Sequence, residues 1–276
     1  MHLKYVKKIN HSGILHGKIG PYFVNGHFLY GNKEDAESLL EFIDSELSNS
    51  KKEEIPEHIF SKVSNQYKTN EIYSIIIKNL IKYIKHNINI DEIDYISGGE
   101  RRDWFFSNII AHLLKKPHIT VFKDLSCMLS NYNFTKTESI ANLNKGKVLH
   151  VADLLNQASS YLRAWIPAIK NLNGTIKWSL SCIDRNQGGK EKLEKENINS
   201  YSLINIDLDL FNQALDLNII NNNQLSMLLE YTSDPDATMR KFLKQHPEFL
   251  DQSLNGNTKT AKRAKMCIDN NIYNLW

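Results

Sequence analysis

The sequence contains little of what defines the specialised protein classes. Cysteine occurs only three times in 276 residues, at the widely spaced positions Cys127, Cys182 and Cys267, which argues against a disulfide framework or a zinc site and favours a reducing cytoplasm. No apolar run approaches the roughly 20 residues of a membrane span. The N-terminus has basic residues but no apolar core of a signal peptide. We therefore expect a cytoplasmic protein without a membrane partner.

Charge of one sign is also scarce. The formal net charge is only +3, which is too small to indicate a nucleic-acid partner. The densest basic cluster, KTAKRAK at 259–265, has no interleaved aromatic residues and is interpreted as a solvated helix face. The ten histidines show no i, i+4 pairing typical of a metal site. His150, inside an apolar run, is interpreted as a hydrogen-bonded core residue.

In the middle of the chain, short apolar runs alternate with stretches in which apolar residues follow helical spacing. With 41% hydrophobic residues there is ample material for a core. Apolar runs predict strands, and helical spacing between them predicts helices. The predicted strands are 93–97, 118–122, 147–151, 175–183 and a last one near 201–206, and the predicted helices include 104–116 and 159–171. This alternation is typical of an α/β fold with a mostly parallel sheet flanked by helices.

The two ends differ from this middle. Residues 19–31 are rich in aromatic residues and are interrupted by glycines and a proline, which predicts an extended segment or hairpin. Helical spacing predicts a first helix from Asp35 and a second over 67–86, joined by a polar connector that contains Pro56. After residue 206 the pattern changes to short helices broken by asparagine runs and prolines. We therefore predict a main domain over 1–206 and a helical C-terminal extension over 207–276.

In a doubly wound sheet, ligands bind outside the carboxyl ends of the strands, so the residues that follow each strand are the candidates. SGGERRD follows the first strand of the series. Gly98 and Gly99 would let the backbone approach a ligand, and Arg101 and Arg102 supply fork-shaped donors suited to phosphate at a helix N-terminus. An ordinary turn, with the arginines paired to neighbouring acids, explains the same residues.

Two later strand ends carry further candidates. Asp153 follows the run at 147–151, and the hydroxyls of Ser159 and Ser160 with nearby backbone N–H groups suit an anion. A helix cap is the alternative for Asp153. In the stretch IDRNQGG, Arg185 could grip a planar carboxylate bidentately, or pair with the aspartate beside it.

Three stretches, in order, resemble orotate phosphoribosyltransferases of the type I phosphoribosyltransferase family. LHGKIGPYFVN is similar to the family segment LKSG-x-x-SPYF-x-N, and IDRNQGG to the late segment DR-x-E-x-G. VADLLNQASS lies where the family has its signature for 5-phosphoribosyl pyrophosphate (PRPP): two acids, two apolar residues and Thr-Thr-Gly-x-Ser. The resemblance covers about residues 13–206. It implies a type I phosphoribosyltransferase-like fold, with an N-terminal hood over about 1–90 and a core over about 91–206.

The resemblance also implies a function. The reaction transfers a phosphoribosyl group from PRPP to orotate or a related base with Mg²⁺, in pyrimidine nucleotide biosynthesis or salvage. This glycosyltransferase chemistry needs mainly positioning and neutralisation of the departing pyrophosphate. A homodimer is implied as well.

The resemblance assigns roles to particular positions. Asp153 would meet the ribose hydroxyls, and Lys123 would stand for a catalytic cation. Tyr22 and Phe23 would border the base, while Arg185 would hold the orotate carboxylate. The residues expected to bind the phosphate and pyrophosphate groups are Asn156, Gln157, Ala158, Ser159, Ser160, Gly98, Gly99, Arg101 and Arg102.

The sequence departs from the family at several of these positions. Ala152 replaces the first acid of the signature, and Asn156-Gln157-Ala158 replaces Thr-Thr-Gly. Leu15 stands where the family has a lysine. Asp124 reverses a charge, and the Lys-x-His of a mobile loop that closes over the pyrophosphate is missing. The alternatives are therefore a non-catalytic regulatory homologue that binds PRPP or a nucleotide, and a scaffold with a vestigial site.

Overall fold

The structure is a computed structural model that describes residues 13–15, 18–22, 24–256 and 258–275. The chain divides into two compact units, which are described separately below. The larger is Asn25–Ile206, and the smaller combines Met1–Val24 with Asp207–Trp276. The division after residue 206 falls where the sequence predicts the start of the helical extension. Residues 1–24, which the sequence groups with the main domain, fall in the smaller unit.

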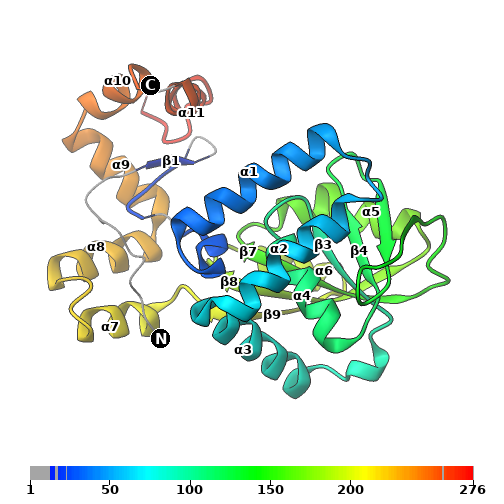
Figure 1. The fold of residues 1–276 in the computed structure, drawn as a ribbon. Coiled ribbons are helices and arrows are strands. Elements are labelled where there is room, and N and C mark those ends of the chain that lie inside the picture. The colour runs from blue at the N-terminus through cyan, green and yellow to red at the C-terminus, as the bar shows by residue number, and fades with distance from the viewer. Residues whose placement is uncertain (1–12, 16–17, 23, 257, 276) are drawn as a thin grey trace. The chain divides into compact units, whose positions relative to one another are not determined.

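The larger unit is built around a seven-stranded sheet in the order β6-β5-β4-β3-β7-β8-β9 (Figure 1). The strands β4, β3, β7, β8 and β9 pair in parallel, and β5 and β6 add an antiparallel edge. This confirms the predicted fold class, a mostly parallel α/β sheet. The strand bounds are β3 (Tyr95–Gly99), β4 (His118–Val121), β5 (Cys127–Ser130), β6 (Thr137–Ser139), β7 (Lys147–Leu155), β8 (Thr175–Asp184) and β9 (Asn199–Asn205).

The strand order reverses between β3 and β7. From β3 the chain first moves outward to β4, and then returns to the other side of β3 to form β7, β8 and β9 in turn. Such a reversal leaves a crevice at the carboxyl ends of the two strands that flank it, and ligands bind there in doubly wound sheets. Gly99 ends β3, and Asp153 lies near the end of β7. Two of the candidate motifs are therefore neighbours at this switch point.

Helices cover both faces of the sheet, as the glycines at the end of β3 show. A Cβ atom on Gly98 would lie 2.1 Å from Ser107 Oγ in α4 (Trp104–Leu114). A Cβ atom on Gly99 would lie 2.2 Å from the Trp165 ring, in the π-helical segment Tyr161–Trp165. Because successive strand residues point to opposite faces, these helical segments lie on opposite sides of β3. The two glycines permit close helix packing.

The remaining helices of this unit are α1 (Lys33–Asn49), α2 (Ile55–Thr69), α3 (Glu71–Asn87), α5 (Ile166–Asn171) and α6 (Gly189–Lys195), with short 3-10 turns η1 (Gly26–Tyr30) and η2 (Ile90–Glu92). The predicted polar connector between the first two helices is wrong, because it contains the start of α2. Pro56 stands in the first turn of α2, where its missing N–H costs no hydrogen bond. Ile59 and Val63 continue the buried face.

Two further predictions need correction. The extended segment or hairpin predicted for 19–31 is wrong over its second half, since Gly26–Tyr30 form η1. The described hairpin pairs β1 (Gly13–Leu15) with β2 (Lys18–Gly20) instead. Two strands for which no element was predicted, β5 and β6, follow β4, and their lengths of 4 and 3 residues are too short to show a period.

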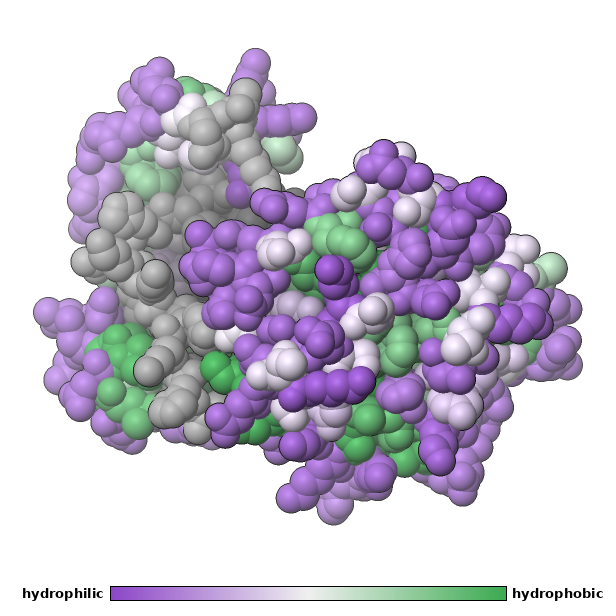
Figure 2. Space-filling view, in the orientation of Figure 1, coloured by the Kyte–Doolittle hydropathy of each residue, from purple (hydrophilic) through white to green (hydrophobic). Residues whose placement is uncertain are grey.

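The smaller unit is mainly helical, as predicted for 207–276. Its helices are α7 (Leu208–Asp216), α8 (Asn222–Ser233), α9 (Pro235–Gln245), α10 (Glu248–Leu254) and α11 (Thr258–Asp269). In α11, Lys262 and Lys265 are exposed while Ala264 and Cys267 are buried, which fits the predicted solvated basic face. Among the described residues, no helix combines the length and apolar content that a membrane span requires. The visible surface in Figure 2 is mostly hydrophilic, with small hydrophobic areas.

Substituting Gly99 by alanine tests the packing at the end of β3. We expect the free energy of unfolding to fall by roughly 1–3 kcal/mol, because the new methyl group would overlap the buried Trp165 ring. Denaturant unfolding followed by fluorescence measures this change. An unchanged stability in Gly99→Ala would contradict the close approach of the two segments.

Candidate functional site

The carboxylate of Asp103 connects the two strands at the switch point. The ladder between β3 and β7 ends at the pair Ser97–His150, so the last residues of the two strands are not bonded to one another. Asp103, just before α4, accepts the Gly99 N–H at 3.0 Å and the Asp153 N–H at 3.1 Å, one on each oxygen. Asp103 is 8% exposed. One buried side chain thus holds both strand ends.

A buried polar chain extends from Asp103 into the sheet. His150 Nε2 lies 3.4 Å from Asp103 Oδ2, and His150 Nδ1 is 2.8 Å from Ser97 Oγ. The His150 ring stacks on Trp165 at 6.2 Å between centroids. His150 and Ser97 are fully buried, which confirms that His150 is a hydrogen-bonded core residue. Ser97, His150 and Asp103 neighbour one another in that order in space. Because the Ser97 hydroxyl is buried, it cannot act as a nucleophile.

Asp153 is a buried carboxyl group beside another carboxylate. Burial, followed by the negative charge of Asp103, raises the pKa of Asp153 to about 7, while Arg102 acts in the opposite direction. This carboxyl group therefore holds its proton more tightly than an exposed aspartate does. Perturbed carboxyl groups of this kind are common at functional sites. The helix-cap alternative for Asp153 is not needed, because Asp153 lies within β7.

The loop after β7 leads directly into a helical segment. Residues 156–158 form the turn, and helix begins at Ser159. The first N–H groups of a helix have no intrahelical acceptor, so they are available to an anion. Ser159 and Ser160 are exposed, and the Gln157 carbonyl accepts Lys192 Nζ of α6 at 3.3 Å. The loop therefore offers N–H and hydroxyl donors at the end of β7.

Ala158 adopts a backbone conformation that suits glycine. Its φ angle is +54°, which costs a residue with a Cβ atom roughly 1–2 kcal/mol. Ala158 stands at the position of the glycine in the Thr-Thr-Gly signature. The loop therefore holds a residue with a Cβ atom in the left-handed region.

The two arginines after β3 have different partners. Arg101 forms an ion pair with Asp44 of α1. Arg102 is exposed and forms no ion pair with the described residues, while its charge lowers the pKa of both His27 and Asp153. Neither arginine pairs with Glu100 or Asp103, so the ordinary-turn interpretation is wrong in that detail. The positive charge that reaches Asp153 from this loop comes from Arg102.

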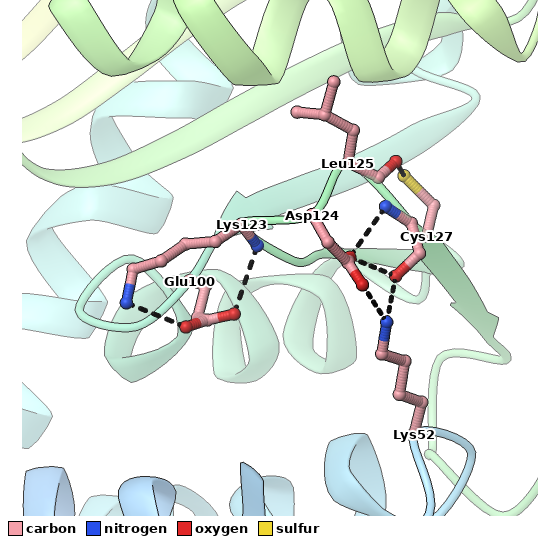
Figure 3. A network of polar contacts seen from close by, with 7 residues as sticks. Lys52, Glu100, Lys123, Asp124, Leu125 and Cys127 are labelled. Atoms are coloured by element: carbon pink, nitrogen blue, oxygen red, sulfur yellow. Dashed lines mark hydrogen bonds and ion pairs between the residues drawn. The ribbon is translucent and has the colours of Figure 1, made fainter.

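Lys123 is engaged by a neighbouring acid. Its Nζ lies 2.9 Å from Glu100 Oε1, and its backbone N–H donates to Glu100 Oε2 at 3.1 Å (Figure 3). Asp124 forms an ion pair with Lys52, and accepts hydrogen bonds from the N–H and hydroxyl of Ser126. The Lys52 bond is the main cause that lowers the pKa of Asp124 to about 2. The charges of this turn are thus balanced locally.

The same segment is a tight hairpin turn. β4 ends at Val121 and β5 begins at Cys127, with Phe122 N–H donating to Ser126 O at 3.0 Å. A connection this short cannot extend far from the sheet, because each residue spans at most about 3.6 Å. The loop that closes over the pyrophosphate in the resembled family has no counterpart between these two strands.

The residues expected to bind the nucleobase, Arg185, Tyr22 and Phe23, come from distant parts of the sequence. Arg185 is 8% exposed and follows β8, and its N–H donates to Leu155 O at 2.9 Å, close to the phosphate loop. Tyr22 belongs to the smaller unit, where its ring packs edge-on against Phe211 and Tyr231. Phe23 lies outside the described residues. The roles of these three residues stay predictions.

Two residues of the site were missed by the sequence analysis. Asp103 was considered only as a possible partner for the arginines, and His27 was counted only among the unpaired histidines. His27 Nδ1 lies 4.0 Å from Asp153 Oδ2. The available signal was an acid at the N-terminus of α4, and a histidine beside a glycine in the segment GPYFVNGH. Neither signal identifies its partner without the strand order.

The sheet order and the loops at its switch point define a type I phosphoribosyltransferase-like fold. No protein-family profile matches the chain. A curated orotate phosphoribosyltransferase of Sulfolobus acidocaldarius is 24% identical over 164 residues, which are 58% of this chain and 76% of that protein. The chain is therefore similar to orotate phosphoribosyltransferases, in agreement with the sequence resemblance.

Solved structures give weaker similarities. Orotate phosphoribosyltransferase of Francisella tularensis has a TM-score of 0.48 at 14% identity, covering 81% of this chain and 92% of that chain. The enzyme of Aeropyrum pernix has a TM-score of 0.42 at 16% identity, covering 56% and 81%. UMP synthase of Leishmania donovani has a TM-score of 0.46 at 16% identity, covering 65% of this chain and only 35% of that chain.

Replacement of Asp153 by asparagine should change how stability depends on pH. The folded-state pKa of about 7 lies above the unfolded value of about 3.9, so the unfolded chain loses this proton first. The contribution of Asp153 to stability is therefore complete below pH 4 and is lost as pH rises through 7, by a few kcal/mol (order of magnitude). Denaturant unfolding of both proteins between about pH 4 and pH 8 isolates the difference. A pH-independent difference would contradict the raised pKa.

Replacement of Asp103 by asparagine should loosen the switch point. Asparagine offers only one acceptor oxygen, so either Gly99 or Asp153 loses its bond, at a cost of roughly 1–3 kcal/mol. The pKa of Asp153 should fall, because a negative neighbour is removed. Carboxyl ¹³C NMR titration of Asp153 measures this shift. Asp124→Asn, on the exposed β4–β5 turn, is the control and should leave the Asp153 titration unchanged, because Asp124 is not among the groups that shift the pKa of Asp153.

Proposed function

We propose that the protein binds PRPP and transfers its phosphoribosyl group to orotate or a related base. The observation that carries the proposal is the pairing of a buried carboxyl group, Asp153, with the helix-initiating loop 156–160 at the switch point of the sheet. A carboxylate suits ribose hydroxyls, and free N–H groups at a helix start suit the 5′-phosphate. The biological context proposed with it is pyrimidine nucleotide biosynthesis or salvage.

Each part of PRPP has a proposed partner. Asp153 accepts hydrogen bonds from the ribose hydroxyls, and the N–H groups and hydroxyls of 156–160 bind the 5′-phosphate. Gly98, Gly99 and Arg102 border the pyrophosphate, whose departing charge Arg102 stabilises. The reaction passes through an oxocarbenium-like ribose centre, so positioning and charge neutralisation contribute more than covalent chemistry. Arg101 contributes less, since Asp44 already pairs with it.

The base is proposed to lie against the remaining motifs. The Arg185 guanidinium offers two parallel N–H donors for the orotate carboxylate. For Tyr22 and Phe23, in the segment GPYFVN, the base-binding role is proposed from the sequence resemblance alone. Specificity for orotate depends on Arg185, because bases without a carboxylate would leave its charge without a ligand partner.

A resident magnesium site does not fit the residues present. Among the described residues, no three carboxylate, histidine or cysteine side chains gather in a way that could hold a metal ion. Both Asp103 oxygens already accept hydrogen bonds from backbone N–H groups. Asp153 is then the one acid of the signature loop that could bind a metal ion. We therefore propose that Mg²⁺ enters only as part of the PRPP substrate, held mainly by phosphate oxygens.

A second candidate function is supported by the β4–β5 turn. That turn is too short to cover a bound pyrophosphate, and Lys123 is neutralised by Glu100. Each lost charge-assisted contact removes transition-state stabilisation that binding alone does not require. The alternative is thus a non-catalytic homologue that binds PRPP or a nucleotide as a regulator.

Calorimetric titration with PRPP and Mg²⁺, together with an absorbance assay of orotate consumption, separates these functions. Binding with turnover supports the transferase, and binding without turnover on any base supports the regulator. Asp153→Ala should weaken PRPP binding by about tenfold or more, because it removes a charged acceptor. Asp91→Ala, at an exposed position before the amino end of β3, is the control and should bind PRPP normally. Folded protein without PRPP affinity would overturn both functions.

A homodimer, implied by the resemblance, is proposed as the working assembly. Light scattering after size-exclusion chromatography gives the mass of the particle directly. A monomer at the concentration of the activity assay would contradict this part of the proposal.

A further inference from the structure

His27 carries a buried nitrogen that lacks a hydrogen-bond partner. The residue is 4% exposed, and its Nδ1 makes no hydrogen bond within the part of the chain that the structure describes. The nearest acceptor atom recorded for it is Asp153 Oδ2 at 4.0 Å, beyond hydrogen-bond distance. Unpaired buried polar atoms destabilise a fold and are uncommon, so this one requires an explanation.

The position of His27 is fixed by its neighbours. A Cβ atom on Gly26 would lie 2.4 Å from the Asp153 carbonyl oxygen, so glycine is needed for η1 to lie against the end of β7. The His27 ring packs against Phe28 at 4.6 Å and edge-on to Phe105 at 6.2 Å between centroids. The imidazole is therefore held beside Asp153 by packing, and not by a polar contact of its own.

The charges around His27 indicate what kind of group fits the gap. Burial, Arg102 and Arg101 lower the pKa of His27 to about 4, so the ring is neutral near pH 7. A neutral imidazole and a carboxyl group attract a hydroxyl, which both donates and accepts hydrogen bonds. A phosphate would instead meet the Asp153 carboxyl group without a cation from His27. An oxygen about 2.8 Å from each atom can bridge a gap of 4.0 Å.

We propose that His27 and Asp153 together bind the vicinal diol of the ribose ring, with His27 taking the place of the acid that is missing at Ala152. Ala152 is 2% exposed and packs in the hydrophobic cluster with Tyr161 and Trp165, so it offers the ligand nothing. The second diol partner then comes from η1 and not from β7. This inference rests on the proposed binding of PRPP.

Binding of paired ligands tests this role. Calorimetry compares ribose 5-phosphate with 2-deoxyribose 5-phosphate, which lacks one hydroxyl of the diol, and PRPP serves as the reference ligand. We expect the unaltered protein to prefer the ribose compound by about tenfold, the effect of one well-made hydrogen bond to a partly charged site. His27→Ala should lose most of this preference. His27→Asn, whose amide reaches the place of Nδ1, should restore part of it.

The control variant is His118→Asn. His118 is a second buried histidine of the same unit, bonded to Ser107 and Thr120 and without a recorded contact to Asp153. Its replacement should lower stability but keep the preference for ribose. If His27→Ala proves unfolded, the Nδ1 ¹⁵N shift in the unaltered protein replaces it, and a shift on ribose 5-phosphate but not on the deoxy compound is expected.

The outcomes separate this inference from the function on which it rests. PRPP binding together with an unchanged ribose preference in His27→Ala overturns the role of His27 and leaves the proposed function standing. A ¹⁵N shift of His27 Nδ1 that does not change on addition of ribose 5-phosphate also overturns the role of His27. Absence of PRPP binding in the unaltered protein overturns both.

Discussion

The site depends on one carboxylate that bonds to two strands. Parallel β3 and β7 separate after the pair Ser97–His150, because a switch point requires the chain to leave the sheet in opposite directions. Asp103 spans this separation by accepting the N–H groups of Gly99 and Asp153. Without it, two backbone donors would be buried and unpaired. The same contact places a negative charge beside Asp153, so a structural bond and the proton affinity of the candidate site cannot be changed independently.

Charge is distributed unevenly around this point. Arg101, Lys123 and Asp124 are each paired with a residue of the fold, whereas Arg102 forms no ion pair with the described residues. The cations that a pyrophosphate would need are therefore largely used to hold the surrounding loops together. Binding of a ribose phosphate uses mainly hydroxyl partners and N–H groups, which the site does provide. Stabilisation of a leaving pyrophosphate needs cationic side chains that are not already paired, and few of the cations near this site meet that condition.

The sequence predicted those parts of the fold whose periodicity follows directly from burial. The apolar runs of β4, β7 and β8 and the helical spacing in α3 and α4 were recognised, because each pattern extends over enough residues to be distinctive. The helix α2 was missed except for its last residues, since the charges before Pro56 hid the spacing of Ile59 and Val63. The motif at Asp153 was located by resemblance. Its partners Asp103 and His27 were not, because both lie far away in the chain and meet Asp153 only through the strand order.

The short turn between β4 and β5 has a consequence for kinetics. A site that is covered by a loop exchanges its ligand at the rate at which that loop opens, often microseconds to milliseconds. The segment Phe122–Ser126 is held by hydrogen bonds within the turn and by contacts with Lys52. It therefore adds no loop-opening step to ligand exchange. A ligand bound at the proposed site would therefore not wait for this segment to open before it leaves. Fast exchange would suit the proposed regulator, whereas the proposed transferase would have to complete its reaction within a short residence time of its substrate.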